Sequence, residues 1–283
     1  MEQIASGFKI AKKITKHFAK TFYLASFFLP QDKRLASYAV YAICRISDES
    51  VDSLKGNCSE LSLKELRKKI DLAYTNAALN NNLLSAFRKT VNTYSIPKEY
   101  FYELIDGMNM DLVKNRYADF EELKEYCFKA AGVVGLIMLK IFGAKDAKAE
   151  KFASDLGIAM QLTNILRDIK EDALRGRIYI PLNEFKNFKI SEADIISGKI
   201  NDDFKRLMQH QIKRAREYYQ ESEKGLSLIN NPKSRFVATA MKEMYQTILD
   251  EIKNNHYNVF NQRAHVNKFK KLLIIIKILL KRK

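Results

Sequence analysis

The chain has 283 residues, and its 47% hydrophobic content is enough for a sizeable core in one large domain or two small ones. Lys and Arg outnumber Asp and Glu by 49 to 33, and the net charge of +16 favours anionic partners, unless it only forms a solvated basic surface. The 3 cysteines form no C-x-x-C pair, which argues against a disulfide framework or a zinc site and indicates a reducing compartment.

Only 10 glycines and 4 prolines interrupt the chain. Between them apolar residues recur at helical spacing, and no convincing run of alternating strand residues occurs, so the sequence predicts an all-α fold. We expect one domain, residues 1–283, that ends in a basic amphipathic tail at 268–283. The predicted helices span residues 5–27, 32–54, 62–79, 82–94, 98–113, 119–141, 145–172, 201–229, 233–254 and 266–281, with a short helix near 191–196.

The N-terminal region has a superficial likeness to a signal peptide, since basic residues 12–20 precede the apolar residues 22–29. The apolar run is short and ends at Pro30, so we reject that interpretation. No uninterrupted apolar run reaches the ~18 residues of a spanning helix. We therefore expect a cytoplasmic protein that is either free or peripheral on the inner face of the membrane.

Two polar stripes share one template about 120 residues apart, with offsets of 0, 4, 7, 11 and 0, 3, 7, 11. Each set falls on one helical face and ends in two aspartates four residues, or about one turn, apart. D-x-x-x-D pairs that face each other across a cavity suit Mg²⁺ and a diphosphate, because Mg²⁺ prefers oxygen ligands. The alternative is two amphipathic helices with solvated faces. The stripes are Tyr41, Arg45, Asp48 and Asp52, and Gln161, Asn164, Asp168 and Asp172.

Together these motifs resemble the squalene/phytoene synthase family, the head-to-head branch of the trans-isoprenoid synthases. The resemblance runs from about Phe18 to Lys271 and includes K-T-F-Y-L-A-S-F-F-L-P, L-I-D-G-M-N-M-D-L and R-G-R-I-Y-I-P. It also includes the segments 126–135, 156–172 and 257–263. Two departures are Thr21, where the family usually has Ser, and D-E-S-V-D, where D-D-x-x-D is commoner. The resemblance implies an isoprenoid synthase helical bundle around a central cavity.

The resemblance also implies roles for individual residues. Several Mg²⁺ ions would bind Asp48, Asp52, Asn164, Asp168 and Asp172. The catalytic group would be Tyr41, Arg45, Asp48, Asp52, Asp168 and Asp172. The substrate-binding group would be Lys20, Thr21, Tyr126, Gln161, Asn164, Tyr245 and Arg263. Tyr faces can stabilise a carbocation by about 2 kcal/mol when desolvated, although each Tyr is nearly as well explained as a core residue.

The implied reaction is head-to-head condensation of two allylic prenyl diphosphates, C20 geranylgeranyl or C15 farnesyl, through a cyclopropylcarbinyl diphosphate. The product would be a phytoene or dehydrosqualene type hydrocarbon formed without reductant. A squalene or presqualene diphosphate synthase is the alternative, and NADPH would be needed only for squalene. Ser26, one turn from Phe22, slightly favours a C20 chain. A non-catalytic assembly factor or a nucleic-acid binder would leave the four aspartates unexplained, so we expect no nucleic acid partner. The oligomeric state stays open.

Several further residues have open roles. Asp111 either approaches the metal site or orients Arg116. Gly132 and Gly135 lie in an apolar helix, where Gly costs about 1 kcal/mol against Ala, so they either open room for a prenyl chain or allow close helix packing. Glu171 is one residue off its stripe and is interpreted as a surface or supporting group.

The tail 268–283 is too short and too charged to span a bilayer, but it suits an interfacial helix on anionic lipid. The alternative is a C-terminal helix that packs on the domain with its lysines solvated. On a helical wheel, one arc carries Leu272, Leu273, Ile275, Ile276, Leu279 and Leu280. The other carries Lys270, Lys271, Lys277, Lys281 and Arg282, with Ile274 and Ile278 among them.

Overall fold

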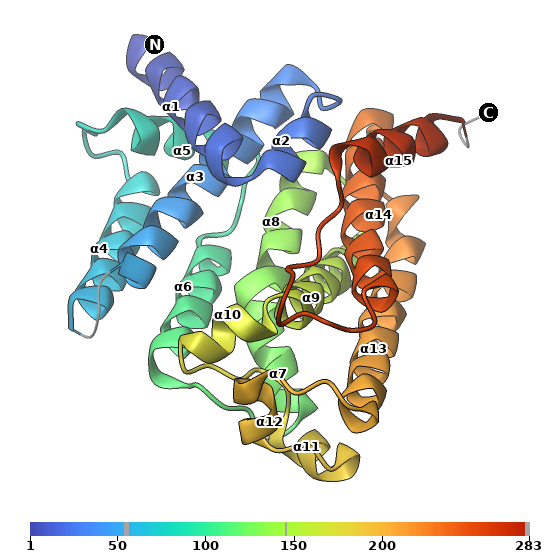
Figure 1. Ribbon diagram of the computed structural model, residues 1–283. Coiled ribbons are helices and arrows are strands. Elements are labelled where there is room, and N and C mark those ends of the chain that lie inside the picture. Colours follow the sequence, from blue (N-terminus) through green and yellow to red (C-terminus); the bar gives the residue numbers. More distant parts are fainter. Residues whose placement is uncertain (54–56, 145, 281–283) are drawn as a thin grey trace.

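The computed structural model describes residues 1–53, 57–144 and 146–280, and the side chains of residues 46–60 lie outside this description. Within the described residues the regular structure is helical, apart from one isolated bridge between Ala144 and Ile229. This confirms the predicted all-α class (Figure 1). A search of these residues finds no helix with the length and apolar character that crossing a membrane requires.

Most helices of the first half of the chain gather around α3 and α8, whereas α7 contacts η1 and α9 (Figure 1). Asn81 begins α5 by accepting a hydrogen bond from the Leu84 amide at 2.9 Å, and Asp119 begins α7 in the same way. The elements are α1 (Glu2–Phe18), α2 (Lys20–Ser26), α3 (Gln31–Ser53), α4 (Asn57–Ala73), α5 (Asn82–Thr93), α6 (Lys98–Val113), α7 (Phe120–Cys127), the π-helical turn η1 (Phe128–Gly132) and α8 (Val133–Phe142).

The second half packs α13 along the central helix α9, where Thr163 and Tyr219 share a buried hydrogen bond of 2.8 Å. The helix α15 crosses near α14 and α2 (Figure 1). The elements are α9 (Ala149–Arg167), α10 (Ile169–Leu174), α11 (Leu182–Phe188), α12 (Glu192–Ser197), α13 (Asp202–Leu226), α14 (Pro232–Asn254) and α15 (Lys268–Leu280).

Three of the predicted helices are each interrupted once. The helix predicted at 5–27 breaks at Ala19, whose backbone leaves the helical region at φ −113° and ψ 54°. The helix predicted at 119–141 contains η1, and the one predicted at 145–172 begins at Ala149 and breaks at Asp168. Each interruption borders the central cavity, and π-helical turns are frequent at functional sites.

Two other parts of the helix prediction were wrong, one helix boundary and one helix that was missed. The helix predicted at 62–79 spans Asn57–Ala73 instead. The guanidinium of Arg88 donates hydrogen bonds to the carbonyls of its last two residues, Leu72 and Ala73, and to that of Ala77 beyond its end. Helix α11 was not predicted, because a single short helix after Pro181 carries too few residues to show a period.

Two hydrophobic clusters form the core, and each combines residues from both halves of the chain. Phe87 and Phe101 pack edge to face at 4.9 Å in the first cluster, and Phe204 and Phe260 pack in the second. Burying one such side chain contributes about 2–3 kcal/mol. Phe128 and Ile274 pack against both clusters, which joins them. The prediction of one domain stays a prediction.

Helices α8 and α9 approach each other through glycine. A Cβ on Gly135 would lie 2.1 Å from the Ala153 carbonyl oxygen, and one on Gly157 would lie 2.2 Å from that of Ala131. A Cβ on Gly132 would meet Phe128 and Ser154 at 3.0 Å. These distances decide the open alternative in favour of close helix packing, although Gly135 also lines the cavity.

Candidate active site

A cavity of about 1070 Å³ lies at the centre of the bundle. Its wall is formed by the α1–α2 break, α3, α6, η1, α8, α9, α10 and α13–α15, so elements from the whole chain contribute to it. The structure brings together in this wall every predicted site residue whose side chain is described. These are Lys20, Thr21, Tyr41, Arg45, Tyr126, Gln161, Asn164, Asp168, Asp172, Tyr245 and Arg263.

The first aspartate pair is placed only at the level of the backbone. Asp48 and Asp52 belong to the C-terminal part of α3, three and seven residues beyond the cavity-lining Arg45 on the same helix. Their side chains fall outside the described residues. Their assignment as metal ligands therefore stays a prediction.

The second stripe bends at the break between α9 and α10. Asp168 ends α9 with φ −106° and ψ 14°, and its carbonyl still accepts a hydrogen bond from the Asp172 amide at 2.9 Å. The turn is therefore continued across the break. Both aspartates line the same cavity, as the predicted spacing required.

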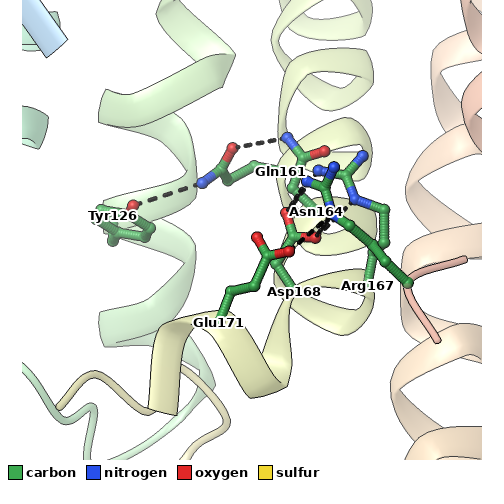
Figure 2. A network of polar contacts seen from close by, with 7 residues as sticks. Tyr126, Gln161, Asn164, Arg167, Asp168 and Glu171 are labelled. Atoms are coloured by element: carbon green, nitrogen blue, oxygen red, sulfur yellow. Dashed lines mark hydrogen bonds and ion pairs between the residues drawn. The ribbon is translucent and has the colours of Figure 1, made fainter. Parts of the chain in front are cut away.

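Two arginines hold the Asp168 carboxylate (Figure 2). Arg167 donates from Nε at 2.8 Å and from a terminal nitrogen at 2.5 Å, and Arg263 donates at 2.8 and 3.0 Å. Glu171 lies 3.4 Å from the same Arg263 guanidinium, so it supports the arginine, as expected for a residue off the stripe. Burial alone would raise the pKa of Asp168, but the two arginines outweigh it and lower that pKa.

A chain of amide groups leads from Asn164, one turn before Asp168, to Tyr126 (Figure 2). Asn164 donates to Gln161 at 3.3 Å, and Gln161 donates to the Tyr126 hydroxyl at 3.4 Å. The Asn164 Oδ1 atom is buried and has no hydrogen-bond partner. A buried oxygen one turn from Asp168 is a donor of the kind that Mg²⁺ takes.

The fit to a divalent cation is therefore partial within the described part of the chain. Among those residues, no three His, Cys, Asp or Glu side chains form a ready metal cluster. Asp168, Asp172 and the unbonded oxygen of Asn164 supply oxygen ligands from one wall only. Any further carboxylate ligands would have to come from the predicted Asp48 and Asp52.

Asp111 anchors two tyrosines at the cavity. The Tyr179 hydroxyl donates to it at 2.7 Å and the Tyr126 hydroxyl at 3.1 Å, while the two rings stack at 5.0 Å. The suggestion that Asp111 orients Arg116 was wrong, because Arg116 pairs with Glu192 instead. Burial, followed by the charge of Asp111, raises the pKa of both tyrosines, which keeps them protonated as donors.

Asp172 differs from Asp168 in its charge state. Burial, then the nearby charges of Asp168 and Asp111, raise the pKa of Asp172 to about 7. Without a cation the folded protein therefore retains this proton at pH values where the unfolded chain, at the ordinary pKa of 3.8, has released it. Stability is lost as pH rises from about 4 to about 7, and the full penalty remains above that range.

We expect Asp172→Asn to remove this penalty. Between pH 5 and pH 8 the melting temperature of metal-free wild type should fall relative to that of the variant by about 5–10 °C, because this range carries about 2.7 kcal/mol of the penalty and each kcal/mol shifts the melting temperature by ~2–4 °C. Scanning calorimetry at both pH values measures the difference. Parallel pH curves for the two proteins would mean that Asp172 is already ionised at pH 5.

The other end of the polar region is basic. Lys271 of α15 donates to the Thr21 hydroxyl at 2.7 Å, beside Lys20 at the start of α2. Burial lowers the pKa of Lys271. Arg45 lies 4.6 Å over the Phe18 ring. The break at Ala19 is what turns Lys20 and Thr21 toward the cavity, so the Thr that replaces the family's usual Ser keeps a hydroxyl at this wall.

Sequence reasoning assigned no role to several polar cavity residues. Arg167 lies off the helical stripe and reaches Asp168 only because the helix ends there. Lys271 comes from a tail whose position depends on tertiary packing. The remaining three polar residues of the wall are Arg175, Arg177 and Tyr179. They belong to the R-G-R-I-Y-I-P block, which is the sequence signal that could have identified them.

The rest of the cavity is apolar. Phe22, Met138, Phe152 and Met241 belong to its wall. Ser26 does not: it is fully buried and its hydroxyl is bonded to the Tyr38 hydroxyl at 2.5 Å. The expectation that Ser26 opens space directly was therefore wrong, because the α2 helix directs Phe22 and not Ser26 to the cavity.

Comparison with known proteins identifies the fold family. The pattern that defines squalene/phytoene synthases matches residues 15–270. The chain belongs to the squalene/phytoene synthase family. It is 37% identical to a phytoene synthase of Arthrospira platensis over 96% of this chain and 92% of that protein. It is 41% identical to a chloroplastic phytoene synthase of an Oncidium hybrid cultivar, over 93% of this chain and 65% of that protein.

Solved structures of this family share the architecture. A dehydrosqualene synthase crystal structure superposes with a TM-score of 0.92 at 27% identity, over 100% of this chain and 99% of that one. The squalene synthase HpnC from Alicyclobacillus acidocaldarius gives a TM-score of 0.84 at 27% identity, over 91% of this chain and 97% of that one. These likenesses confirm the predicted isoprenoid synthase fold of the squalene/phytoene synthase chain.

Proposed function

We propose that the protein condenses two allylic prenyl diphosphates head to head, through a cyclopropylcarbinyl diphosphate, to a phytoene-type hydrocarbon with release of diphosphate. One observation carries this proposal. A single cavity of about 1070 Å³ has carboxylates, amides and cationic side chains in one part of its wall and apolar side chains in the rest. Such a cavity fits molecules with a polyanionic head and a long hydrocarbon tail. The names of the relatives support the same reaction class.

The acidic and the basic residues of the cavity would have different roles. Mg²⁺ would supply Lewis-acid neutralisation of the departing diphosphate, held by Asp168, Asp172 and Asn164 together with the predicted Asp48 and Asp52. Cationic side chains in the cavity wall would bind the same diphosphate, since a guanidinium can donate two hydrogen bonds to phosphate oxygens. We assign this role to Lys20, Arg45, Arg263 and Lys271.

The tyrosines would stabilise the organic cation. Tyr41, Tyr126 and Tyr245 line the cavity, and the negative face of a desolvated ring stabilises a cation by about 2 kcal/mol. The Tyr126 hydroxyl is held by Asp111, so the ring has a fixed orientation. Fixed dipoles stabilise a developing charge without reorganisation at the moment of reaction.

The cavity volume admits the carbon chains of either candidate substrate. An apolar cavity of ~150 Å³ holds benzene, or about 25 Å³ per carbon, so two C20 chains need about 1000 Å³. The cavity has about 1070 Å³. Two C15 chains also fit, so dehydrosqualene or squalene formation stays the alternative, and an NADPH requirement would mark squalene.

Product analysis tests the reaction. The protein is incubated with Mg²⁺ and either geranylgeranyl or farnesyl diphosphate, with and without NADPH, and the hydrocarbon is identified by mass spectrometry. We expect a C40 triene from the C20 substrate in the absence of reductant. A hydrocarbon that forms only with NADPH would assign the chain to squalene synthesis. Absence of turnover with both substrates would favour the assembly-factor alternative.

We further propose that α15 lies on an anionic membrane surface. It carries two apolar faces: Ile274, Ile275 and Ile278 pack on the bundle, although Ile275 was predicted on the free arc. The other face is exposed. Its side chains are 42–67% accessible, and they are Phe269, Leu272, Leu273, Ile276, Leu279 and Leu280.

Charge complementarity favours lipid as the occupant. Lys268 and Lys277 are exposed beside the apolar face, and each basic residue near anionic lipid contributes about 1 kcal/mol. Lys271 on the same helix faces the cavity, so a bilayer at α15 would lie beside the entrance for a lipophilic substrate. Such a helix binds at the interface without spanning it.

Sedimentation with phosphatidylglycerol vesicles measures this contact. The triple variant Leu272→Gln, Ile276→Gln, Leu279→Gln leaves the packed face intact and should reduce the bound fraction about tenfold, by removing apolar burial. The matched control is Leu61→Gln, Leu72→Gln, Ile196→Gln, which alters three exposed apolar residues elsewhere. Equal binding of the α15 variant and wild type would exclude α15 as the membrane contact.

A further inference from the structure

Residues 175–182, here called the arginine strap, form one side of the polar cavity. The strap follows α10 and carries Arg175 and Arg177 into the cavity wall beside Asp172. Gly176 between them has φ +78°, a left-handed conformation that Gly adopts at little cost. The strap therefore brings two cationic side chains toward the place where a diphosphate would bind.

The segment 115–118 after α6 fastens the strap along its length. The Ile178 amide donates to the Asn115 carbonyl at 3.0 Å, and the Leu182 amide donates to the Tyr117 carbonyl at 2.9 Å. The rings of Tyr117 and Tyr179 stack at 5.7 Å. These contacts hold the second half of the strap.

Arg116 holds the first half, at the peptide between the two arginines. One terminal nitrogen donates to the Gly176 carbonyl at 2.7 Å and to the Asn115 carbonyl at 2.7 Å. The other terminal nitrogen and Nε donate to the two carboxylate oxygens of Glu192 on α12, at 2.8 and 3.0 Å. A bidentate pair fixes the plane of the guanidinium. One side chain thus ties the strap to α12 and to its own segment.

We propose that Arg116 is a positioning residue for the anion-binding side of the active site. Arg116 does not line the cavity, so it would act through the strap that carries Arg175 and Arg177. Fixing the strap in advance removes the ordering cost from substrate binding. This inference rests on the proposed diphosphate chemistry.

Two measurements test the role. The first is the affinity for inorganic diphosphate with Mg²⁺, by titration calorimetry. We expect Arg116→Met to weaken it about tenfold and to raise KM for the prenyl diphosphate by a similar factor, since misplacement of binding groups has effects of this size. Arg116→Lys keeps the charge and should recover part of the affinity. The second is hydrogen exchange of the strap amides, which should accelerate at least tenfold in Arg116→Met.

Arg214→Met is the matched control. Arg214 makes an ion pair with Glu184 at 2.6 Å and is no more exposed than Arg116, but none of its hydrogen bonds reaches the strap. We expect it to lower stability without changing diphosphate affinity or strap exchange. Equal losses in Arg116→Met and Arg214→Met would show that Arg116 acts only through stability, and unchanged affinity in Arg116→Met would overturn the proposal.

Two further outcomes require their own measurements: a variant that does not fold, and a wild type that does not bind diphosphate. If Arg116→Met does not fold, Glu192→Gln removes the partner charge at an exposed position and should weaken diphosphate binding about threefold; unchanged binding there overturns the inference. If wild type does not bind diphosphate, the proposed function fails. The strap exchange then still decides whether Arg116 orders these residues, because that measurement needs no ligand.

Discussion

Asp168→Asn is expected to lower turnover by about 10²–10³-fold while the helical content stays unchanged. The substitution removes the charge that would hold a cation against the departing diphosphate, and losing one electrostatic contact to a transition state has effects of this size. It also leaves Arg167 and Arg263 without their shared carboxylate. Steady-state kinetics measures the loss, and circular dichroism confirms the fold.

Asp155→Asn provides the matched control for this variant. Asp155 lies on the same helix, is paired with Lys151 at 2.8 Å, and is 13% exposed against 16% for Asp168. It does not line the cavity. We expect it to retain near-normal turnover. If Asp168→Asn also retained it, Asp168 would have no part in the reaction, and the metal assignment of the second stripe would be abandoned.

Removal of divalent cations is expected to abolish activity, by at least about 10³-fold, and Mg²⁺ should restore it. Asp172 lies near the charges of Asp168 and Asp111, and a divalent cation would offset their repulsion of a diphosphate. Ca²⁺ should restore little, because it prefers six to eight ligands at longer distances. Turnover is measured after dialysis against EDTA and after each addition.

Thermal stability gives a second reading of the same site. Mg²⁺ and diphosphate added together should raise the melting temperature more than the sum of the separate additions, because each supplies ligands for the other. A ligand at 100 times its Kd adds about 2.7 kcal/mol to the free energy of unfolding. Full activity after chelation, or no joint stabilisation, would contradict a metal-bridged diphosphate site.

Helical spacing predicted the second stripe well because its physical basis is local. Gln161, Asn164 and Asp168 lie on one helix, and the hydrogen bond from the Asp172 amide to the Asp168 carbonyl continues the turn beyond the break. The pattern survives the interruption of α9 and α10. The resemblance then supplied the distant partners, such as Arg263, that no local pattern could connect with Asp168.

The missed features depend on contacts between distant segments. Lys271 and Thr21 are 250 positions apart, and their hydrogen bond exists only because α15 docks beside α2. The burial of Ile275 has the same cause, since a helical wheel shows which residues share a face but not which face meets the bundle. The break at Ala19 could not be predicted from the sequence, because the helical spacing of the apolar residues before it continues into K-T-F-Y after it.

The contact of α8 with α9 limits how this enzyme can evolve toward other substrate lengths. Residues 135 and 157 cannot gain even a methyl group, because a backbone carbonyl already occupies that space. This part of the wall has a fixed position. A lineage that lengthens or shortens its product must therefore change the side chains that remain adjustable, among them Phe22, Met138 and Met241. Methionine accommodates such changes readily, since its side chain is unbranched and flexible.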